Sequence, residues 1–232
     1  MSLLIPNHHP INPDGLVLWL DYKNTGSVAA TGTWKDYSGN GNDGTLVADA
    51  YVDNNGVNLD GDNDSAELST SNTQGQSTIT ITAWIKATTI SKTNTIYYES
   101  TSTDAVRGRF ALSVTQTNQL RLAGRDDDGG DFEIWAVSSD SVIGVNTWYH
   151  VVGVYDSTTG NHKVYLNGSD VTNTGSGGTN PLDSGNSLYA AVGALPGATP
   201  FEFTGVVDAV QLYTRALSVG EIQGLYQRTL RA

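Results

Sequence analysis

Apolar and polar residues alternate along much of this chain. Residues 78–86 read Thr-Ile-Thr-Ile-Thr-Ala-Trp-Ile-Lys, so that every second side chain is aliphatic or alanine. A period of two is typical of a β-strand with one buried face. Comparable runs, separated by turn residues, predict further strands at 16–20, 57–59, 65–68, 95–100, 109–115, 119–124, 132–137, 148–155, 162–166, 187–193 and 203–213.

One of these runs predicts where its strand lies in the sheet. Residues 148–155 are almost continuously apolar or aromatic, which predicts a central strand covered on both faces. Within that run His150 shares a face with Val152, and we expect a hydrogen-bonded core histidine.

Asn167-Gly168 follows the next run and favours a hairpin, because this pair adopts positive φ at low cost. Antiparallel strands at such intervals predict a two-sheet jelly-roll sandwich.

A single helix is predicted, close to the C-terminus. Ser218 precedes Glu221 by three residues, the spacing of a capping box. Ile222, Leu225 and Tyr226 then recur at helical intervals. At the other end, three prolines disfavour regular structure. We therefore expect an extended arm at residues 1–14 and one all-β sandwich domain at 15–232, with one short C-terminal helix.

Five groups of residues resemble motifs of one family. They are residues 36–44 (Asp-Tyr-Ser-Gly-Asn-Gly-Asn-Asp-Gly), 59–64, 79–86, 148–156 with 164–168, and 207–213 with 215–218. In order and spacing they resemble the laminin-G-like domains of the concanavalin A-like lectin/glucanase superfamily, over roughly residues 15–227. Leu59 replaces an aromatic residue of the family. The resemblance implies a concanavalin A-like jelly roll in which the early glycine-rich loop lies near the late strand.

Composition narrows the range of partners. The chain has 12 Lys and Arg against 24 Asp and Glu, a formal charge of −12. An acidic surface repels phosphate, so nucleic acid is not an expected partner.

Cysteine is absent, which excludes disulfides and thiol catalysis. No apolar run reaches the roughly 18 residues of a membrane helix, and no secretory signal is recognisable. We expect a soluble protein without membrane insertion, acting outside a cell or on a virion surface.

Oxygen-rich residues suggest a structural calcium site. Asp36, Asn40 and Asn42 offer side-chain oxygens in the glycine-rich loop, and Asp208 is an acid within an apolar strand. Calcium prefers such mixtures of carboxylate, amide and carbonyl oxygen, and the family resemblance implies that loop and strand approach each other. The alternative is that Asp36 opens an Asx turn and Asp208 accepts backbone N–H groups.

Aromatic and acidic residues near loops are candidates for ligand binding. Trp34 and Trp135 border loops and would stack on sugar rings if exposed, whereas packing in the core is the alternative. Asp126, Asp128 and Asp131 form an acidic cluster that suits a hydroxyl-rich ligand or a cation, with a solvated loop as the alternative. Residues 60–64 imitate half of an EF-hand, but the rest of the motif is missing, and we expect a hairpin turn there.

Catalytic motifs are missing from the sequence. No strand carries the alternating acids of concanavalin A-like glycosidases, and neither HExxH nor GxSxG occurs. We therefore expect a non-catalytic binding or adhesion module that recognises a glycan or a surface, as a decoration or tail-associated component of a virion. In that setting residues 1–14 would attach to a capsid or tail protein or to symmetry mates. The alternatives are a structural particle protein without a glycan ligand and, third, a glycoside-active enzyme.

Overall fold

The computed structural model describes residues 12–22, 32–100, 108–126, 133–175, 177–185, 189–194 and 201–228. Its strands are β1 (Leu16–Leu20), β2 (Thr33–Trp34), β3 (Gly44–Val47), β4 (Tyr51–Asp53), β5 (Gly56–Asp60), β6 (Ser65–Leu68), β7 (Thr78–Ala87), β8 (Asn94–Ser100), β9 (Gly108–Val114), β10 (Leu120–Gly124), β11 (Glu133–Ser138), β12 (Tyr149–Asp156), β13 (Lys163–Leu166), β14 (Ser169–Asp170), β15 (Thr172–Thr174), β16 (Tyr189–Val192) and β17 (Thr204–Tyr213). One helix follows, α1 (Val219–Arg228).

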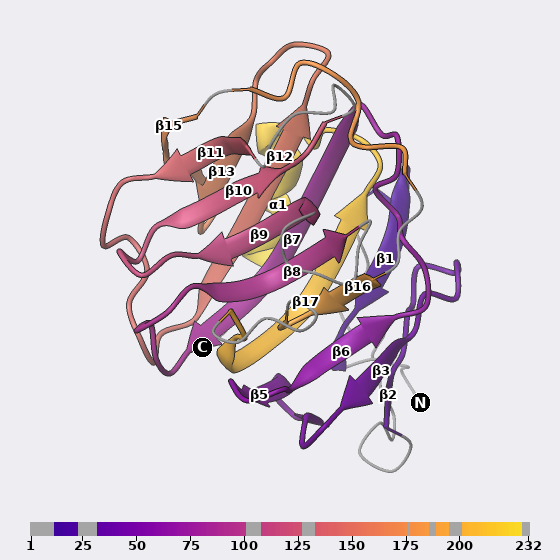
Figure 1. The fold of residues 1–232 in the computed structure, drawn as a ribbon, viewed down its shortest axis with the longest axis vertical. Helices are drawn as coiled ribbons and strands as arrows, with labels where there is room; N and C mark the ends of the chain where they lie inside the picture. The colour runs from indigo at the N-terminus through magenta and orange to yellow at the C-terminus, as the bar shows by residue number, and fades with distance from the viewer. Residues whose placement is uncertain are drawn as a thin grey trace, which may run out of the picture.

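The strands form two antiparallel sheets stacked face to face (Figure 1). The eight-stranded sheet has the order β14-β13-β12-β7-β17-β5-β4, with β1 pairing beside β17. The nine-stranded sheet has the order β15-β11-β10-β9-β8-β16-β6-β3-β2. The predicted two-sheet antiparallel sandwich with a short C-terminal helix is confirmed.

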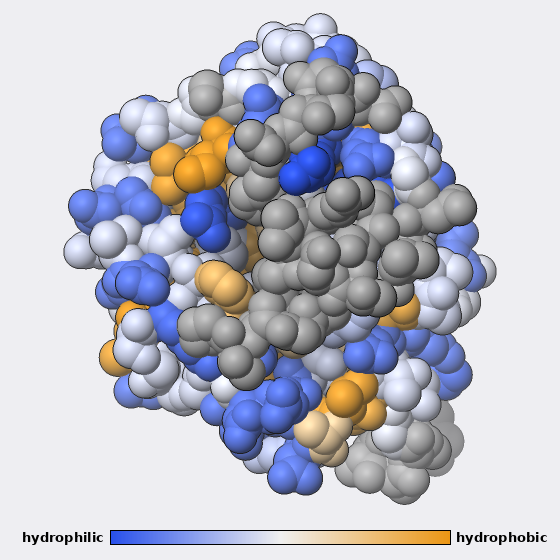
Figure 2. All heavy atoms as spheres, in the orientation of Figure 1, coloured by the Kyte–Doolittle hydropathy of each residue, from blue (hydrophilic) through white to orange (hydrophobic). Residues whose placement is uncertain are grey.

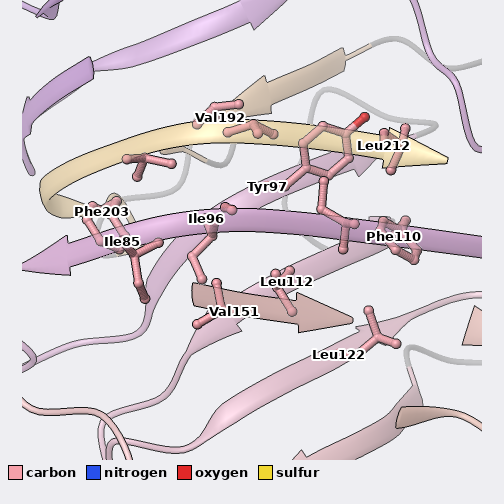
Figure 3. Packing of buried hydrophobic residues seen from close by; sticks show 14 of the residues in the cluster. Ile85, Ile96, Tyr97, Phe110, Leu112, Leu122, Val151, Val192, Phe203 and Leu212 are labelled. Carbon is pink, nitrogen blue, oxygen red and sulfur yellow. The ribbon is translucent and has the colours of Figure 1, made fainter. Parts of the chain in front are cut away.

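Side chains from the two sheets meet in one hydrophobic core. Figure 3 shows Ile85, Val151 and Phe203, from or next to strands of the eight-stranded sheet, among Ile96, Leu112 and Leu122 of the nine-stranded sheet. All six are completely buried. Burying one such side chain contributes about 1.5–3 kcal/mol relative to leaving it exposed, so this interior holds the two layers together.

Helix α1 covers part of the outer face of the eight-stranded sheet. Ile222 and Leu225 of the helix pack with Trp19, Val152 and Tyr213 in a second buried cluster. This explains why the middle of β12 is buried on both faces, as its apolar sequence predicted. The helix begins with the predicted capping box, in which the hydroxyl of Ser218 accepts the Glu221 N–H at 3.3 Å and the Ser218 N–H reaches the Glu221 carboxylate at 2.9 Å.

The beginning and end of the sandwich lie side by side. Leu20 of β1 pairs with Val210 of β17, and the Thr214 N–H donates to the Gly15 carbonyl at 2.8 Å. The glycine-rich loop that we expected near the late strand is separated from β17 by β1, because Asp36 pairs with the other side of Leu20. Residues 1–11 of the predicted arm lie outside the described residues.

Two predicted turns had different outcomes. Asn167 and Gly168 both adopt positive φ, 51° and 79°, and turn the chain from β13 to β14 as the dipeptide predicted. The hairpin expected at residues 60–64 is wrong, because β5 belongs to the eight-stranded sheet and β6 to the nine-stranded sheet. The turn therefore carries the chain from one layer to the other.

The described surface carries no broad apolar patch on the face seen in Figure 2, where hydrophobic residues form small separate spots among hydrophilic ones. Among the described residues, no helix has the length and apolarity needed to span a membrane.

Candidate functional site

Asp36 organises the glycine-rich loop from inside. Its two carboxylate oxygens accept the N–H groups of Trp19, Ser38 and Asn42, each at 2.9 Å, and the Ser38 hydroxyl at 2.8 Å. A carboxylate has about four acceptor directions, so these donors occupy all of them. Asp36 thus acts as the Asx-turn residue that the sequence offered as the alternative to calcium.

Asn40 and Asn42 direct their amide nitrogens toward the first strand. Asn40 Nδ2 donates to the Leu16 carbonyl at 3.2 Å, and Asn42 Nδ2 donates to the Val17 carbonyl at 2.7 Å. The Asn42 amide oxygen accepts the Thr70 hydroxyl. These contacts fasten the loop to β1, and the Asn42 amide oxygen already has a protein donor.

The four predicted calcium ligands do not converge. Leu20 of β1 pairs with Asp36 on one side and with Val210 on the other, so β1 runs between the loop and β17. Asp208 lies on the β17 side, where it accepts the Tyr22 N–H at 3.0 Å. Calcium ligands all lie about 2.3–2.6 Å from the ion, so this arrangement does not fit one calcium ion. Among the described residues, no group of three His, Cys, Asp or Glu side chains is placed to hold a metal.

The two tryptophans proposed as sugar platforms are buried. The exposed fractions of Trp34 and Trp135 are 0% and 1%, and both belong to the core between the sheets. The expectation of free ring faces is therefore wrong. The reason is the twofold strand period, which turns both indoles toward the opposite sheet.

Asp126, the first residue of the predicted acidic cluster, is also buried. Its carboxylate accepts the backbone and side-chain N–H groups of Asn180 at 3.2 and 3.3 Å. It therefore ties residues 177–185 to the end of β10. Asp128 and Asp131 lie outside the described residues.

A hollow of about 510 Å³ opens on the outer face of the eight-stranded sheet. The part of this face under α1 is covered, whereas the part over β4, β5 and the start of β17 is open. We call it the Tyr51 hollow; its polar and aromatic lining residues are Asp49, Tyr51, Asn58, Asp60, Asp64, Thr88 and Thr204.

Strand register explains why these side chains share one face. Tyr51 of β4 pairs with Asn58 of β5, which pairs with Val206 of β17. Two residues along, Asp60 pairs with Thr204. Residues two apart on a strand point to the same side. The apolar residues between them, such as Val57 and Val207, face the core and are completely buried.

One buried carboxylate fixes the acidic rim of the Tyr51 hollow. Asp64 is 2% exposed, and its two oxygens accept the backbone N–H groups of Asp49 at 2.9 Å and Asp60 at 3.0 Å. Asp49 and Asp60 are themselves exposed at the mouth. Burial raises the pKa of Asp64; the Asp60 and Asp49 charges add to this, and the two N–H bonds oppose it. Asp64 therefore positions the two exposed acids.

Further contacts make the wall of the Tyr51 hollow rigid. Lys92 Nζ donates to the Gly61 carbonyl at 2.8 Å and to the Glu202 carboxylate at 3.2 Å. Gly205 has φ 141°, and a Cβ there would lie 2.2 Å from the Lys86 carbonyl oxygen, so the floor of the hollow requires glycine. These contacts fix the shape of the hollow.

A second hollow, of about 400 Å³, lies at the opposite edge of the same sheet, where β13 approaches β11 and β15 of the other sheet (Figure 1). We call it the Trp135 hollow; it is lined by Trp135, Gly160, His162, Lys163, Thr172, Asn173, Thr174, Gly175, Gly177 and Thr179. Trp135 thus contributes to a wall, although its ring is not free.

None of Tyr51, Asn58 and Asp49 was a candidate from the sequence, because no local motif marks these positions. The signal available was alternation, since Tyr51, Asp53, Asn58 and Asp60 are the polar or aromatic positions of two short strands whose other positions are mainly apolar. A polar face on an edge hairpin is also what ordinary solvent exposure produces. Only the pairing with β17 reveals that these residues line a hollow.

A family model described as the concanavalin A-like lectin/glucanases superfamily matches residues 60–223. A search of curated proteins finds no match. Solved structures do match. Domain 4 of an extracellular arabinanase from Geobacillus stearothermophilus, in complex with arabinotriose, has a TM-score of 0.61 at 16% identity, covering 91% of this chain and 98% of that domain.

Two other similar structures are larger. The receptor-binding domain of botulinum neurotoxin C/D mosaic serotype has a TM-score of 0.67 at 16% identity, covering 94% of this chain and 52% of that one. Trypanosoma rangeli sialidase in complex with sialic acid has a TM-score of 0.64 at 18% identity, covering 91% of this chain and 32% of that one. This chain therefore spans about half of the toxin domain and a third of the sialidase. At these identities the likeness shows the fold alone.

Proposed function

Since this chain belongs to the concanavalin A-like lectin/glucanases superfamily, we propose that it is a non-catalytic module that binds a neutral glycan in the Tyr51 hollow. One observation carries the proposal. An aromatic ring that is 54% exposed stands beside two exposed carboxylates, over an open face of a rigid sheet.

The chemistry of the Tyr51 hollow suits a sugar. The apolar C–H face of a sugar ring can pack on Tyr51, whose hydroxyl remains available to water or ligand. The carboxylates of Asp49 and Asp60 accept hydrogen bonds from hydroxyl groups, and the Asn58 amide can both donate and accept. A volume of about 510 Å³ lies within the roughly 300–1,000 Å³ usual for small-ligand sites.

Charge favours a neutral ligand. Three aspartates line the Tyr51 hollow, and the whole chain carries a formal charge of −12. A carboxylated or sulfated sugar would bring like charges together and lose affinity. The similar Geobacillus domain was solved in complex with arabinotriose, a neutral saccharide, which supports this choice. The similar sialidase was solved in complex with sialic acid, which is anionic.

The hydrogen bonds of the Asp64 carboxylate favour a binding role over hydrolysis. Glycosidases need a carboxylic acid and a second carboxylate on either side of the scissile bond. Asp64 has the raised pKa of a proton donor, but each of its oxygens already holds a backbone N–H. Its geometry supports a positioning role for the exposed acids.

The biological setting proposed for this binding is outside a cell or on a virion surface, with residues 1–14 as the attachment segment to a capsid or tail protein or to symmetry mates. Deleting residues 1–14 tests this: attachment should be lost while glycan binding persists. A variant lacking the segment that still assembles would contradict it.

A glycan array that carries neutral and sialylated saccharides tests the function. Neutral glycans should be retained, and the Tyr51→Ala variant should bind them more weakly. Retention of sialylated glycans alone, or equal binding by Tyr51→Ala, would overturn the proposal. Release of reducing sugar from a bound glycan would overturn its non-catalytic part.

A further inference from the structure

We propose that the Trp135 hollow is a second binding site for a neutral glycan, so that one chain can cross-link two saccharide chains. This inference rests on the proposed function for its ligand class, but on a different set of residues. It comes from the construction of this hollow, the polar groups around it, and its place in the fold.

The wall of the Trp135 hollow is fixed from two sides. His162 Nε2 lies 3.0 Å from the carbonyl oxygens of both Gly177 and Gly178. The Gly178 N–H donates to the Glu133 carboxylate at 2.8 Å, and that carboxylate also accepts Trp135 Nε1 at 3.1 Å. The glycine segment 177–178 is therefore held between β11 and the residue that precedes β13.

Aromatic packing supports the base of this hollow. The Tyr155 ring packs against both Trp135 and His162, with centroids 4.3 Å and 4.6 Å away, and is nearly parallel to the His162 ring. Side chains other than glycine are excluded at the wall, because a Cβ at Gly175 would lie 1.9 Å from the Trp135 carbonyl oxygen. The space is thus a built feature of the fold.

The groups that face this space suit hydroxyl-rich ligands. Asn173, Thr174 and Thr179 are exposed and carry an amide or hydroxyl group that can donate and accept. The charge of Lys163 is balanced by Asp170, 3.2 Å away. A site that combines donors and acceptors with little net charge matches the alternating hydroxyl groups of a neutral sugar.

The two hollows lie too far apart for one small saccharide. From β13, which lines the Trp135 hollow, to β5, which lines the Tyr51 hollow, the sheet passes through β12, β7 and β17. Four steps of about 4.8 Å give roughly 20 Å. Figure 1 places β13 and β5 at opposite ends of the sandwich. Occupation of both sites would therefore join two separate chains.

Amide chemical shifts in two-dimensional NMR test the second site residue by residue. The probes are four neutral trisaccharides: arabinotriose, xylotriose, cellotriose and triacetylchitotriose. At least one of them should cause saturable shifts at residues 172–174 and 177–179. These shifts should persist in Tyr51→Ala and disappear in Asn173→Trp, which fills the hollow. Gln227→Ala, on the exposed side of α1, is the matched control and should keep both sets.

The outcomes separate the two proposals. Shifts confined to the Tyr51 hollow, or shifts at 172–179 that survive Asn173→Trp, would overturn the second site and leave the proposed function standing. Shifts at 172–179 alone would support the second site and overturn the Tyr51 site. The absence of shifts with all four trisaccharides would overturn both.

Cross-linking gives an independent readout. When the wild-type protein is mixed with a soluble polymer of the trisaccharide that binds, light scattering should rise. Tyr51→Ala and Asn173→Trp should each remain bound to the same polymer on a solid support but leave the solution clear. Equal scattering from wild type and both variants would contradict bivalency.

Discussion

The carboxylate of Asp64 accepts the backbone N–H of Asp49 at 2.9 Å, across 15 residues of sequence. Its second oxygen holds the N–H of Asp60 at 3.0 Å. One buried side chain thereby sets the position of two exposed acids at the mouth of the Tyr51 hollow. This relationship makes Asp64 a residue that couples the stability of the fold to the proposed glycan binding.

Replacing Asp64 with Asn should destabilise the fold and weaken glycan binding. Asn offers one carbonyl oxygen, so either the Asp49 or the Asp60 N–H would face an NH₂ group and lose its acceptor. We expect a loss of about 1–3 kcal/mol in the free energy of unfolding, measured by urea denaturation. Asp62→Asn, at an exposed position of the same turn, should stay within about 0.5 kcal/mol; equal stability of both variants would contradict the assignment.

Tyr51→Ala should weaken binding without affecting the fold. The ring is 54% exposed, so its removal should change stability by no more than about 0.5 kcal/mol. Loss of an aromatic anchor costs more than about 1 kcal/mol in binding, which is at least a fivefold increase in Kd by calorimetry. Tyr37→Ala, at another exposed tyrosine (38%), is the control. An equal loss in both variants would argue against a role specific to Tyr51.

His150 should make the protein sensitive to acid. It is 2% exposed beside Trp84 and Tyr226, and its Nδ1 has no hydrogen-bond partner among the described residues, contrary to the hydrogen-bonded histidine we expected. Burial lowers the pKa of His150 from 6.5 to about 3. The unfolded chain therefore binds the extra proton between pH 6.5 and pH 3, and stability is lost as the pH falls through this window.

The loss in the free energy of unfolding caused by His150 is on the order of 4–5 kcal/mol when the pH reaches 3. His150→Leu should lose less stability than the wild type between pH 7 and pH 4, measured by urea denaturation at each pH. Parallel pH profiles for the two proteins would show that His150 does not carry the acid sensitivity.

Ser218→Ala should loosen α1. The substitution removes the hydroxyl that caps the Glu221 N–H, and loss of such a cap costs about 0.5–2 kcal/mol.

The Arg215 guanidinium, followed by contacts from Ser218, lowers the pKa of Glu221 to about 2. The stability that Glu221 contributes is therefore present above pH 4.5 and lost as the pH falls toward 2. Glu221→Gln should remove this part of the pH dependence, seen by circular dichroism melting.

Calcium stays a prediction, and chelation tests it. An ion present at 100 times its Kd would add about 2.7 kcal/mol to stability, so a lower melting temperature in EDTA would reveal a calcium ion held by fewer than the four predicted residues. Because the acceptor directions of Asp36 are filled by protein donors, the calcium-dependent part of the shift should persist in Asp36→Asn and be reduced in Asp208→Asn. An identical melting temperature with calcium and with EDTA would contradict the prediction.

The strands and the helix could be predicted because their signals are local. The alternation in residues 78–86, the apolar run of β12, the Asn167-Gly168 turn and the capping box of Ser218 each involve residues within one strand, turn or helix. The family resemblance placed the glycine-rich loop near the late strand, and in the structure β1 lies between the two. The hairpin expected at 60–64 was wrong, because the residues of a turn do not determine which sheet the next strand joins.

The candidate site could not be predicted in the same way. Trp34 and Trp135 have loop-bordering sequences but lie in the core, and Asp36 has the chemistry of a calcium ligand but is saturated by three backbone N–H groups and one hydroxyl. The Tyr51 hollow needs Asp64 to reach Asp49 and β17 to pair with β5, contacts between residues up to about 150 positions apart. Local periodicity and turn chemistry determined the strands and the helix from the sequence alone. Only the tertiary structure decided which side chains are exposed together, because exposure depends on contacts with distant parts of the chain.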